Sequence, residues 1–236
     1  MTTLITLKKS MRPDALSDLF PLFNAANPDT LTSLLSAATE LTYPAGRTVL
    51  MEDSWGNAIY LIVAGWIKVR HDTGSGYVTL AVLGKGDFFG EMAILDESPR
   101  STDVVALSPV KLISIPAQHF IDTLFQDPQL HHRMLQMMVQ RLRHTNSHFQ
   151  RRQKPTAVKL AHTLTFLAEA YGEHQDATPE IFNLAMDDLA AIADIPKDDA
   201  AKIMEKLQEK DWISPSQNGQ TLQLKGFNHL TQLAQK

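Results

Sequence analysis

The stretch GDFFGEMAILDESPRSTDVVA, residues 86–106, places two glycines, one acid and one arginine in a short excursion between two strand-like runs. Gly90 lets the backbone turn tightly or approach a ligand where a Cβ would clash. Glu91 follows directly, and its oxygens accept hydrogen bonds from sugar hydroxyls. Arg100 has a planar guanidinium that binds a phosphate through two hydrogen bonds. The stretch predicts a pocket for a phosphorylated sugar.

Two hydroxyl residues complete the predicted pocket. Ser101 and Thr102 directly follow Arg100, so their side chains can close on the same phosphate oxygens. A plainer interpretation makes Glu91 and Arg100 an exposed ion pair and the glycines ordinary turn residues. The sequence before and after the stretch favours the pocket.

Composition defines a globular chain and excludes several kinds of chemistry. The chain has 236 residues, of which 44% are hydrophobic and 20% are charged, as in a protein with a packed core. The absence of cysteine excludes disulfides, thiolate-bound iron-sulfur clusters and a thiol nucleophile. A net charge of −4 gives no overall attraction for nucleic acid, so any such binding requires a local basic patch.

Hydropathy predicts a cytoplasmic protein with no membrane association. The longest apolar run, residues 59–65, has the length of a strand and is too short to cross a bilayer. Residues 1–12 lack the apolar core of a secretory signal.

Residues 41–115 alternate short apolar runs with turn residues, which is typical of a β sandwich or barrel. A helix over residues 29–41 is expected to precede this region, because its leucines recur at helical spacing. The expected strands are residues 48–51, 58–63, 66–70, 77–83, 104–107 and 111–115.

A long helix follows. Asp127 and Pro128 suit its cap and first position, and residues 129–153 contain neither glycine nor proline. An apolar seam with alternating spacings of three and four needs a partner helix, and a parallel twofold homodimer provides one. The seam comprises Leu135, Met138, Leu142, Thr145, Phe149 and Arg152.

The same helix is basic, and two interpretations of its cations stay open. They form a solvated face, or they bind a second phosphate and stack on a guanine. The cations are Arg133, Arg141, Arg143, Arg151, Arg152 and Lys154. His144 and His148 have the spacing of a metal pair but no local third ligand, so no metal site is predicted.

The C-terminal third predicts a winged helix-turn-helix. Lys154-Pro155 ends the long helix, and residues 157–171 form an amphipathic helix followed by a polar loop over residues 172–180. Helices over residues 186–193 and 197–210 are separated by a short turn. A hairpin then follows, with its loop at residues 214–220 and its returning strand at residues 221–224.

The spacing of Gly90, Glu91, Arg100 and Ser101 resembles the phosphate-binding cassette of cyclic-nucleotide-binding domains. The whole chain is similar to the cyclic AMP receptor (CRP/FNR) family of transcription factors. The resemblance implies an α+β protein with an N-terminal cyclic-nucleotide-binding β jelly roll, a dimerisation helix and a winged helix-turn-helix domain. The corresponding domains are residues 1–126, 127–153 and 154–236. Lack of cysteine excludes the family's oxygen-sensing, iron-sulfur branch.

The resemblance also implies roles for individual residues. Gly90 and Glu91 meet the ribose, and Arg100 and Ser101 meet the cyclic phosphate. Thr145 and Asn146 contact the base from the dimer helix, although Thr145 alone also suits a polar residue that sets the register of a helix pair. Cyclic AMP fits this cassette, and cyclic di-GMP is the alternative suggested by the extra arginines.

The second helix of the predicted helix-turn-helix departs from the family. Lys197 and Lys202 stand where relatives carry arginine, and Asp198 stands where relatives carry a base-reading glutamate. Residues 187–210 contain seven acids and four lysines, a net charge of −3 that opposes DNA binding. Asp194 replaces the usual turn glycine and is expected in the left-handed region.

Two classes of function follow. In the first, the chain is a nucleotide-controlled transcription regulator that binds DNA through Lys197, Asp198 and Lys202. In the second, it is a nucleotide sensor whose altered DNA domain acts through a protein partner, such as another transcription regulator. No hydrolytic triad, metal motif or Walker loop occurs in the sequence, so we expect no enzyme activity.

Overall fold

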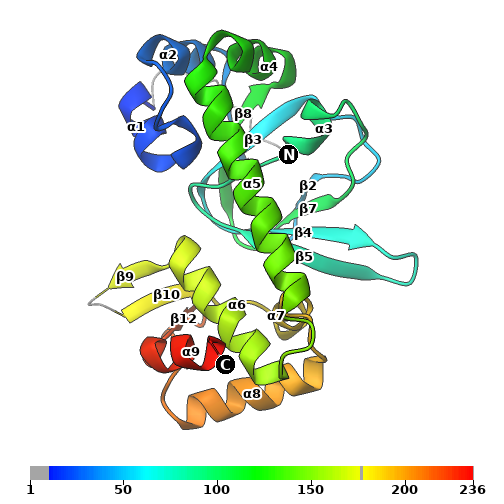
Figure 1. Cartoon of the computed structure of the whole chain (residues 1–236), viewed down its shortest axis with the longest axis vertical. Helices are drawn as coiled ribbons and strands as arrows, with labels where there is room; N and C mark the ends of the chain where they lie inside the picture. Colours follow the sequence, from blue (N-terminus) through cyan, green and yellow to red (C-terminus); the bar gives the residue numbers. More distant parts are fainter. Residues whose placement is uncertain (1–10, 176–177, 236) are drawn as a thin grey trace. The chain divides into compact units, whose positions relative to one another are not determined.

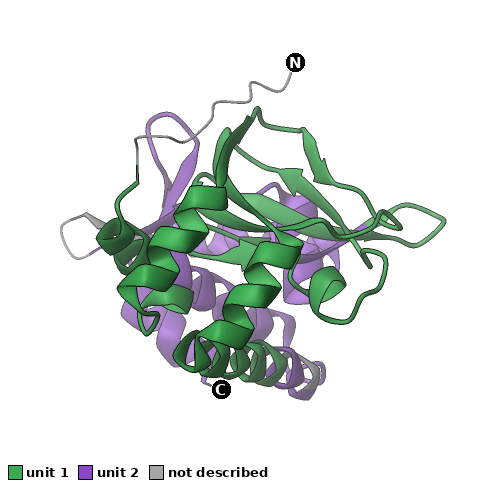
Figure 2. Ribbon diagram, turned by 90° about the horizontal axis from the view of Figure 1, so that it is seen from above, with its two compact units in different colours: residues 1–77, 81–144 green, residues 78–80, 145–236 purple. Residues whose placement is uncertain are grey.

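The computed structural model describes residues 11–175 and 178–235, without the side chains of residues 148–149 and 173–175. The chain divides into two compact units, and Figure 2 colours them separately. Unit 1 comprises residues 1–77 and 81–144, and unit 2 comprises residues 78–80 and 145–236. No helix within the described ranges is both long enough and apolar enough to cross a membrane.

Unit 1 contains two four-stranded sheets (Figure 1). The first has the order β1-β8-β3-β6, with β1 Thr39–Tyr43, β8 Val110–Pro116, β3 Ala58–Ala64 and β6 Phe88–Phe89. The second has the order β2-β7-β4-β5, with β2 Thr48–Leu50, β7 Asp103–Ala106, β4 Ile67–Asp72 and β5 Tyr77–Leu83. The strands of the first sheet pair antiparallel, as do β2, β7 and β4. Two antiparallel sheets agree with the β sandwich or barrel predicted from the sequence.

Strand β1 was not predicted. The helix expected over residues 29–41 ends earlier, as α2 Pro28–Ala37, and the chain then becomes extended. The physical reason is pairing, because Thr39 to Tyr43 lie opposite Ser114 to Val110 on β8. A polar edge strand of this kind is defined by its partner and not by its own hydropathy.

Strand β3 of the first sheet is buried on both faces, because its side chains alternate between two apolar clusters. Ile59 and Leu61 belong to a cluster that includes residues of the unit's helices, and Tyr60 and Ile62 belong to a cluster shared with the second sheet. This alternation follows from the two-residue period of a strand. The helices are α1 Pro13–Leu19, η1 Pro21–Phe23, α2, α3 Met92–Leu95, α4 Ala117–Gln126 and α5 Pro128–Gln150.

Asp127 fixes the start of α5, as the sequence predicted. Its Oδ1 accepts hydrogen bonds from the amides of Gln129 at 3.0 Å and Leu130 at 3.1 Å. Its Oδ2 accepts from the amide of Asn27 at 2.9 Å and from the hydroxyl of Thr30 at 2.8 Å. Burial acts to raise the pKa of Asp127, but these hydrogen bonds lower the pKa below its ordinary value.

The helix α5 has two apolar faces, one packed on the core of unit 1 and one exposed, so the residues of the predicted dimer seam need correction. Leu130 and Met134 are buried in the core of unit 1, and Met138 packs partly against it. A second face leaves Leu135 and Leu142 exposed, with Val139 between them. Val139 therefore takes the place that the predicted seam gave to Met138. Of the other predicted seam residues, Thr145 is exposed, the Phe149 side chain lies outside the described residues, and Arg152 lies beyond the end of α5.

Within the described residues, unit 2 contains the end of α5, four further helices and a four-stranded sheet of order β11-β12-β10-β9 (Figure 1). The helices after α5 are α6 Thr156–Tyr171, α7 Met186–Ala193, α8 Lys197–Glu209 and α9 Phe227–Ala234. The strands are β9 Glu173–Gln175, β10 Thr178–Phe182, β11 Ser214–Pro215 and β12 Thr221–Gln223.

The prediction of a polar loop over residues 172–180 was wrong. It contains β9 and the start of β10, which pair with each other. In β10, Pro179 and Ile181 are buried between less buried neighbours, so the strand has a two-residue period that its few apolar residues conceal.

The turn between α7 and α8 matches its prediction. Asp194 has φ 52° and ψ 52°, which is the left-handed region expected of an aspartate in place of glycine. The Lys159 ammonium donates to the carbonyl oxygen of Asp194 at 2.6 Å and so holds the turn against α6.

Candidate functional site

The candidate site lies between β6 and β7 of unit 1. Gly90 follows β6 and has φ +83°, a conformation that favours glycine. A Cβ on Gly90 would lie 2.9 Å from Nη1 of Arg100 and 3.2 Å from the carbonyl oxygen of Ala58. Gly90 is therefore required twice, by its backbone conformation and by the close approach of the arginine.

Glu91 and Arg100 are buried, with 4% and 5% of their surfaces exposed. This burial contradicts the plainer interpretation of the two residues as an exposed ion pair. Burial lowers the pKa of the Arg100 guanidinium from its ordinary value, and the nearby Tyr60 and Glu91 oppose that change. Two charged side chains of opposite sign are thus removed from water beside one another.

Nη1 of Arg100 is buried and, among the described residues, has no hydrogen-bond partner. A buried donor without an acceptor costs about 1–3 kcal/mol, so native structures rarely retain one without a reason. The guanidinium carbon is 5.8 Å from the ring centroid of Tyr60, which places an aromatic face near the cation. The unsatisfied nitrogen points to an anionic acceptor that enters from outside the chain.

Arg141 of α5 contacts the site from the other side. Its Nη1 donates to Oε1 of Glu91 at 2.6 Å, and its Nη2 donates to Oδ1 of Asp87 and to the carbonyl oxygen of Phe88, both at 2.6 Å. The guanidinium also lies over the Phe88 ring, 4.2 Å from its centroid. One side chain therefore joins α5 to the segment that carries Glu91.

The surroundings of Glu91 set its protonation. Burial raises the pKa of Glu91 above its ordinary value, and the positive charge of Arg141 opposes part of this rise. Without Arg141 the carboxylate form would be less favourable still. Arg141 thus keeps Glu91 a better hydrogen-bond acceptor than its burial alone would allow.

Sequence reasoning placed Arg141 among the basic residues of the long helix without assigning it to Glu91. The spacing of these cations does not tell which of them faces the site. The helix α5 also ends at Gln150, so Arg151, Arg152 and Lys154 lie beyond the helix on which the sequence placed them. Other members of that set also have protein partners. Arg133 donates to the carbonyl oxygen of Pro21 at 2.9 Å, Arg151 donates to Oγ of Ser147 at 3.0 Å, and Arg152 lies 3.6 Å from Asp194.

The remaining predicted nucleotide contacts lie in two places. Ser101 is exposed and Thr102 is partly buried, and both occupy the short segment between Arg100 and β7. Thr145 and Asn146 are exposed on the last turns of α5 and belong to unit 2. Gly90, Glu91 and Arg100 are brought together, whereas contact of Thr145 and Asn146 with a base stays a prediction.

The predicted DNA-binding residues are on the surface of α8. Lys197, Asp198 and Lys202 are all exposed. The Lys197 ammonium is 2.8 Å from a carboxylate oxygen of Asp187 on α7, so part of its charge is neutralised within unit 2.

The His144/His148 pair lacks support as a metal site. Within the described residues no group of three or more histidines, cysteines or acids is placed to hold a metal ion. The side chain of His148 lies outside those residues.

Comparison with known proteins relates the region that carries the candidate site to a described family. Residues 40–127 match the family described as Cyclic nucleotide-binding domain. The cyclic AMP receptor protein of Thermus thermophilus is 26% identical over 196 residues, which cover 80% of this chain and 86% of that protein. A solved transcriptional regulator of the CRP/FNR family from Thermus thermophilus is 21% identical, with a TM-score of 0.66 over 84% of this chain and 98% of that chain.

A further solved structure is the c-di-GMP responsive global regulator CLP of Xanthomonas campestris. It is 18% identical to this chain, with a TM-score of 0.65, and the match covers 84% of this chain and 99% of that one. At this identity the likeness concerns the fold alone.

The matched residues 40–127 include the buried Glu91 and Arg100 and most strands of the two sheets of unit 1. Over 80% of its length the chain is similar to the cyclic AMP receptor protein of Thermus thermophilus, in keeping with the resemblance noted from its sequence.

Proposed function

We propose that the chain is a homodimeric transcription regulator whose DNA-binding domain is controlled by a cyclic nucleotide bound in unit 1. The buried Arg100, whose Nη1 has no hydrogen-bond partner among the described residues, carries the proposal. A cyclic phosphate offers the acceptor that this nitrogen lacks, and it carries the negative charge that a buried guanidinium requires.

The donors and acceptors of the site suit a nucleotide. Arg100 and Ser101, with Thr102 beside them, are proposed to bind the phosphate, because guanidinium and hydroxyl groups donate to its oxygens. Glu91 is proposed to accept a hydrogen bond from a ribose hydroxyl. Gly90 leaves space for Arg100 where a larger residue would collide with it.

Cyclic AMP is the proposed nucleotide, and cyclic di-GMP is the alternative. The sequence suggested cyclic di-GMP because additional arginines of the long helix could bind a second phosphate. Arg133 and Arg141 instead donate to oxygen atoms of the chain itself, which supports a ligand with one phosphate.

Arg141 suggests how binding reaches α5. A ribose hydroxyl that bonds to Glu91 competes with Arg141 for the same carboxylate. The contact between α5 and the site therefore differs in strength with and without ligand, and only such a difference lets a ligand shift a conformational equilibrium. Thr145 and Asn146 are proposed to add a direct contact with the base.

A second copy of the chain is the proposed partner of α5. Leu135, Val139 and Leu142 are exposed at spacings of four and three, with 54%, 47% and 60% of their surfaces accessible. Such a stripe matches the contact row of a helix pair. A parallel twofold dimer would cover it on both copies at once.

The helices α7 and α8 with the β11–β12 hairpin are proposed to form a winged helix-turn-helix that binds DNA through Lys197, Asp198 and Lys202. The net charge of −3 over residues 187–210 supports a second candidate, in which this unit binds a protein such as another transcription regulator. Neither candidate includes catalysis.

Thermal-shift titration tests the proposal. Cyclic AMP is expected to raise the melting temperature of the wild-type chain, because a ligand that binds only the folded state stabilises it. Arg100→Ala is expected to abolish the shift while leaving a folded dimer. The exposed Arg47 of unit 1 provides the control, and Arg47→Ala should respond as the wild type does. A shift with cyclic di-GMP alone would replace the nucleotide, and an equal shift in Arg100→Ala would refute the site.

A further inference from the structure

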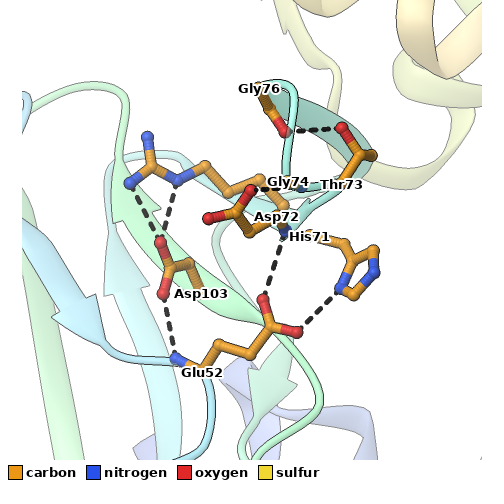
Figure 3. A network of polar contacts seen from close by, with 8 residues as sticks. Glu52, His71, Asp72, Thr73, Gly74, Gly76 and Asp103 are labelled. Atoms are coloured by element: carbon orange, nitrogen blue, oxygen red, sulfur yellow. Dashed lines mark hydrogen bonds and ion pairs between the residues drawn. The ribbon is translucent and has the colours of Figure 1, made fainter.

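Asp103, the first residue of β7, lies three positions after Arg100 and has 9% of its surface exposed. Its Oδ2 accepts two hydrogen bonds from Arg70 on β4, from Nε at 3.1 Å and from Nη2 at 2.9 Å. Its Oδ1 accepts from the backbone amide of Glu52 at 2.9 Å. Figure 3 shows this carboxylate between the end of β4 and the residues that follow β2.

The residues after β2 hold the main chain of Arg100. The amide of Asp53 donates to the carbonyl oxygen of Arg100 at 2.9 Å, and the amide of Arg100 donates to the carbonyl oxygen of Ser54 at 2.9 Å. Glu52, Asp53 and Ser54 are consecutive, so fixing the amide of Glu52 fixes the start of the segment that clamps Arg100. Asp53 itself has φ 60°, an uncommon conformation for a residue other than glycine.

The same segment is tied to β4 by a second set of contacts. Oε1 of Glu52 lies 2.8 Å from Nδ1 of His71, and its Oε2 accepts from the amide of Asp72 at 3.2 Å. The guanidinium of Arg70 lies 3.7 Å from the ring centroid of Tyr77 on β5. In Figure 3 the Glu52 side chain reaches toward His71 while its backbone faces Asp103. The end of β4 thus supports both Asp103 and residues 52–54.

The position of the Arg100 side chain depends largely on the position of its own backbone. Because Nη1 of Arg100 has no hydrogen-bond partner among the described residues, no chain acceptor fixes that end of the guanidinium. Its direction depends on the backbone from which the side chain extends and on packing around Tyr60 and Gly90. A binding group held in place before the ligand arrives binds more tightly, because less freedom is lost on binding.

We propose that Asp103, held by Arg70, is a positioning residue for the phosphate-binding Arg100. Its carboxylate fixes the amide of Glu52, residues 53 and 54 clamp the main chain of Arg100, and the guanidinium is presented to the phosphate in one orientation. This proposal rests on the proposed function in taking Arg100 as the phosphate ligand. It adds a determinant of affinity that touches no part of the nucleotide.

The test compares Asp103→Ala and Asp103→Asn with a matched control. Asp103→Asn keeps an oxygen for the Glu52 amide but weakens the pair with Arg70, whereas Asp103→Ala removes both contacts. Glu40 provides the control, because it forms an ion pair with Lys111 at 3.2 Å in the same unit, and its side chain is 14% exposed against 12% for Asp103. Glu40→Gln should leave nucleotide binding unchanged.

Calorimetry with cyclic AMP and with adenosine gives the first measurement. Asp103→Ala should lower the affinity for cyclic AMP by about 10- to 100-fold, the effect expected when a binding group is displaced by a fraction of an ångström to an ångström. Asp103→Asn should lie between this variant and the wild type. Adenosine lacks the phosphate, so its affinity should not change. Equal losses for both ligands would show a general structural defect and overturn the proposal, as would wild-type affinity for cyclic AMP.

Hydrogen exchange on the ligand-free chain gives the second measurement, which needs no nucleotide. The amides of Asp53 and Arg100 should exchange faster in both Asp103 variants and at the wild-type rate in Glu40→Gln. Unchanged exchange at these two amides would overturn the proposal even if the nucleotide binds. If the wild type binds no cyclic nucleotide, the proposed function fails, and the exchange rates still decide whether Asp103 holds Arg100. If Asp103→Ala fails to fold, the same two measurements on Asp103→Asn decide.

Discussion

The charged residues predicted to bind a partner occupy opposite environments in the two units. In unit 1, Glu91 and Arg100 are almost fully buried and lie against Gly90 and Arg141. In unit 2, Lys197, Asp198 and Lys202 lie on the exposed surface of α8. Exposed charges are the ordinary state of a helix surface, whereas buried charges require compensation.

The difference determines what each unit reveals about its partner. The buried Nη1 of Arg100, which has no hydrogen-bond partner among the described residues, specifies the chemistry of a ligand, since only an acceptor, preferably an anion, removes the cost of its burial. The charges on the surface of α8 require no particular binding partner, because water solvates them and Asp187 pairs with Lys197. Unit 1 therefore defines its ligand more closely than unit 2 defines its target.

The largest effect is expected when one glycine in each unit is replaced by alanine. Gly90 has φ +83° and Gly219, in the β11–β12 hairpin, has φ +69°, so alanine at either position costs about 1–2 kcal/mol of backbone strain. Apart from its two chain neighbours, no described residue has an atom within 4 Å of a Cβ added at Gly219, whereas the Cβ at position 90 would lie 2.9 Å from Nη1 of Arg100. Gly90→Ala should therefore also lower nucleotide affinity at least tenfold, roughly the 1.4 kcal/mol of a displaced charged hydrogen bond.

Thermal melting and calorimetry on the two variants check this expectation. Gly219→Ala should melt at a lower temperature and bind the nucleotide with wild-type affinity. Wild-type affinity in Gly90→Ala would mean that Arg100 tolerates displacement, and the burial of the site would lose its significance for binding.

The next effect depends on pH and concerns Glu91. Because burial raises the pKa of Glu91, its carboxylate takes up a proton at a higher pH than an exposed glutamate does. The carboxylate is the form that accepts from a ribose hydroxyl, so nucleotide affinity should fall as pH is lowered through this raised pKa. Arg141→Ala removes a positive charge that opposes the rise, and should move the decline to higher pH. Arg47→Ala should leave its position unchanged.

Calorimetry from about pH 8 down to about pH 5 measures this decline, since an ordinary glutamate titrates near 4.3. The contribution of Glu91 to folding stability changes in the opposite direction with pH. A folded-state pKa above the unfolded value means that stability attributable to Glu91 decreases as pH rises between the two values. A decline that moves to lower pH in Arg141→Ala would contradict the assignment of Arg141 as the charge that favours the carboxylate.

Local signals explain what the sequence predicted well. The bounds of α7 and α8 and the left-handed Asp194 follow from short-range turn chemistry, which acts between neighbours in the chain. The cap at Asp127 is local in the same way. Gly90, Glu91 and Arg100 were predicted as site residues because glycine next to an acid, followed by arginine and hydroxyl residues, is an uncommon local pattern, and their role in binding stays a prediction.

Contacts across long sequence separations explain what the sequence left out. Strand β1 exists because β8 pairs with it, and β9 exists because β10 does. The assignment of Arg141 to Glu91 joins residues 50 positions apart, and the helix period places Arg141 and Arg143 on different faces without telling which face meets Glu91. The exchange of Met138 for Val139 on the exposed stripe likewise depends on which face of α5 the core of unit 1 covers.

The smallest expected effect lies on α8. Asp198→Asn removes one exposed negative charge, and two unit charges 4 Å apart in water interact by only about 1 kcal/mol. If α8 lies against DNA, the variant should therefore bind DNA more tightly, by no more than about fivefold. Gel-shift titrations at several salt concentrations measure both the affinity and its salt dependence, which reports the number of phosphates neutralised. The exposed Lys202 supplies the opposite change, because Lys202→Gln should weaken binding and make the salt dependence shallower.

Equal binding by wild type, Asp198→Asn and Lys202→Gln would remove α8 from any DNA interface. The protein-partner candidate would then be favoured, since the acids of residues 187–210 would face a basic surface and not a phosphate backbone. In that case unit 2 would resemble unit 1 in one respect, because the sign of its charge would indicate the sign of its partner.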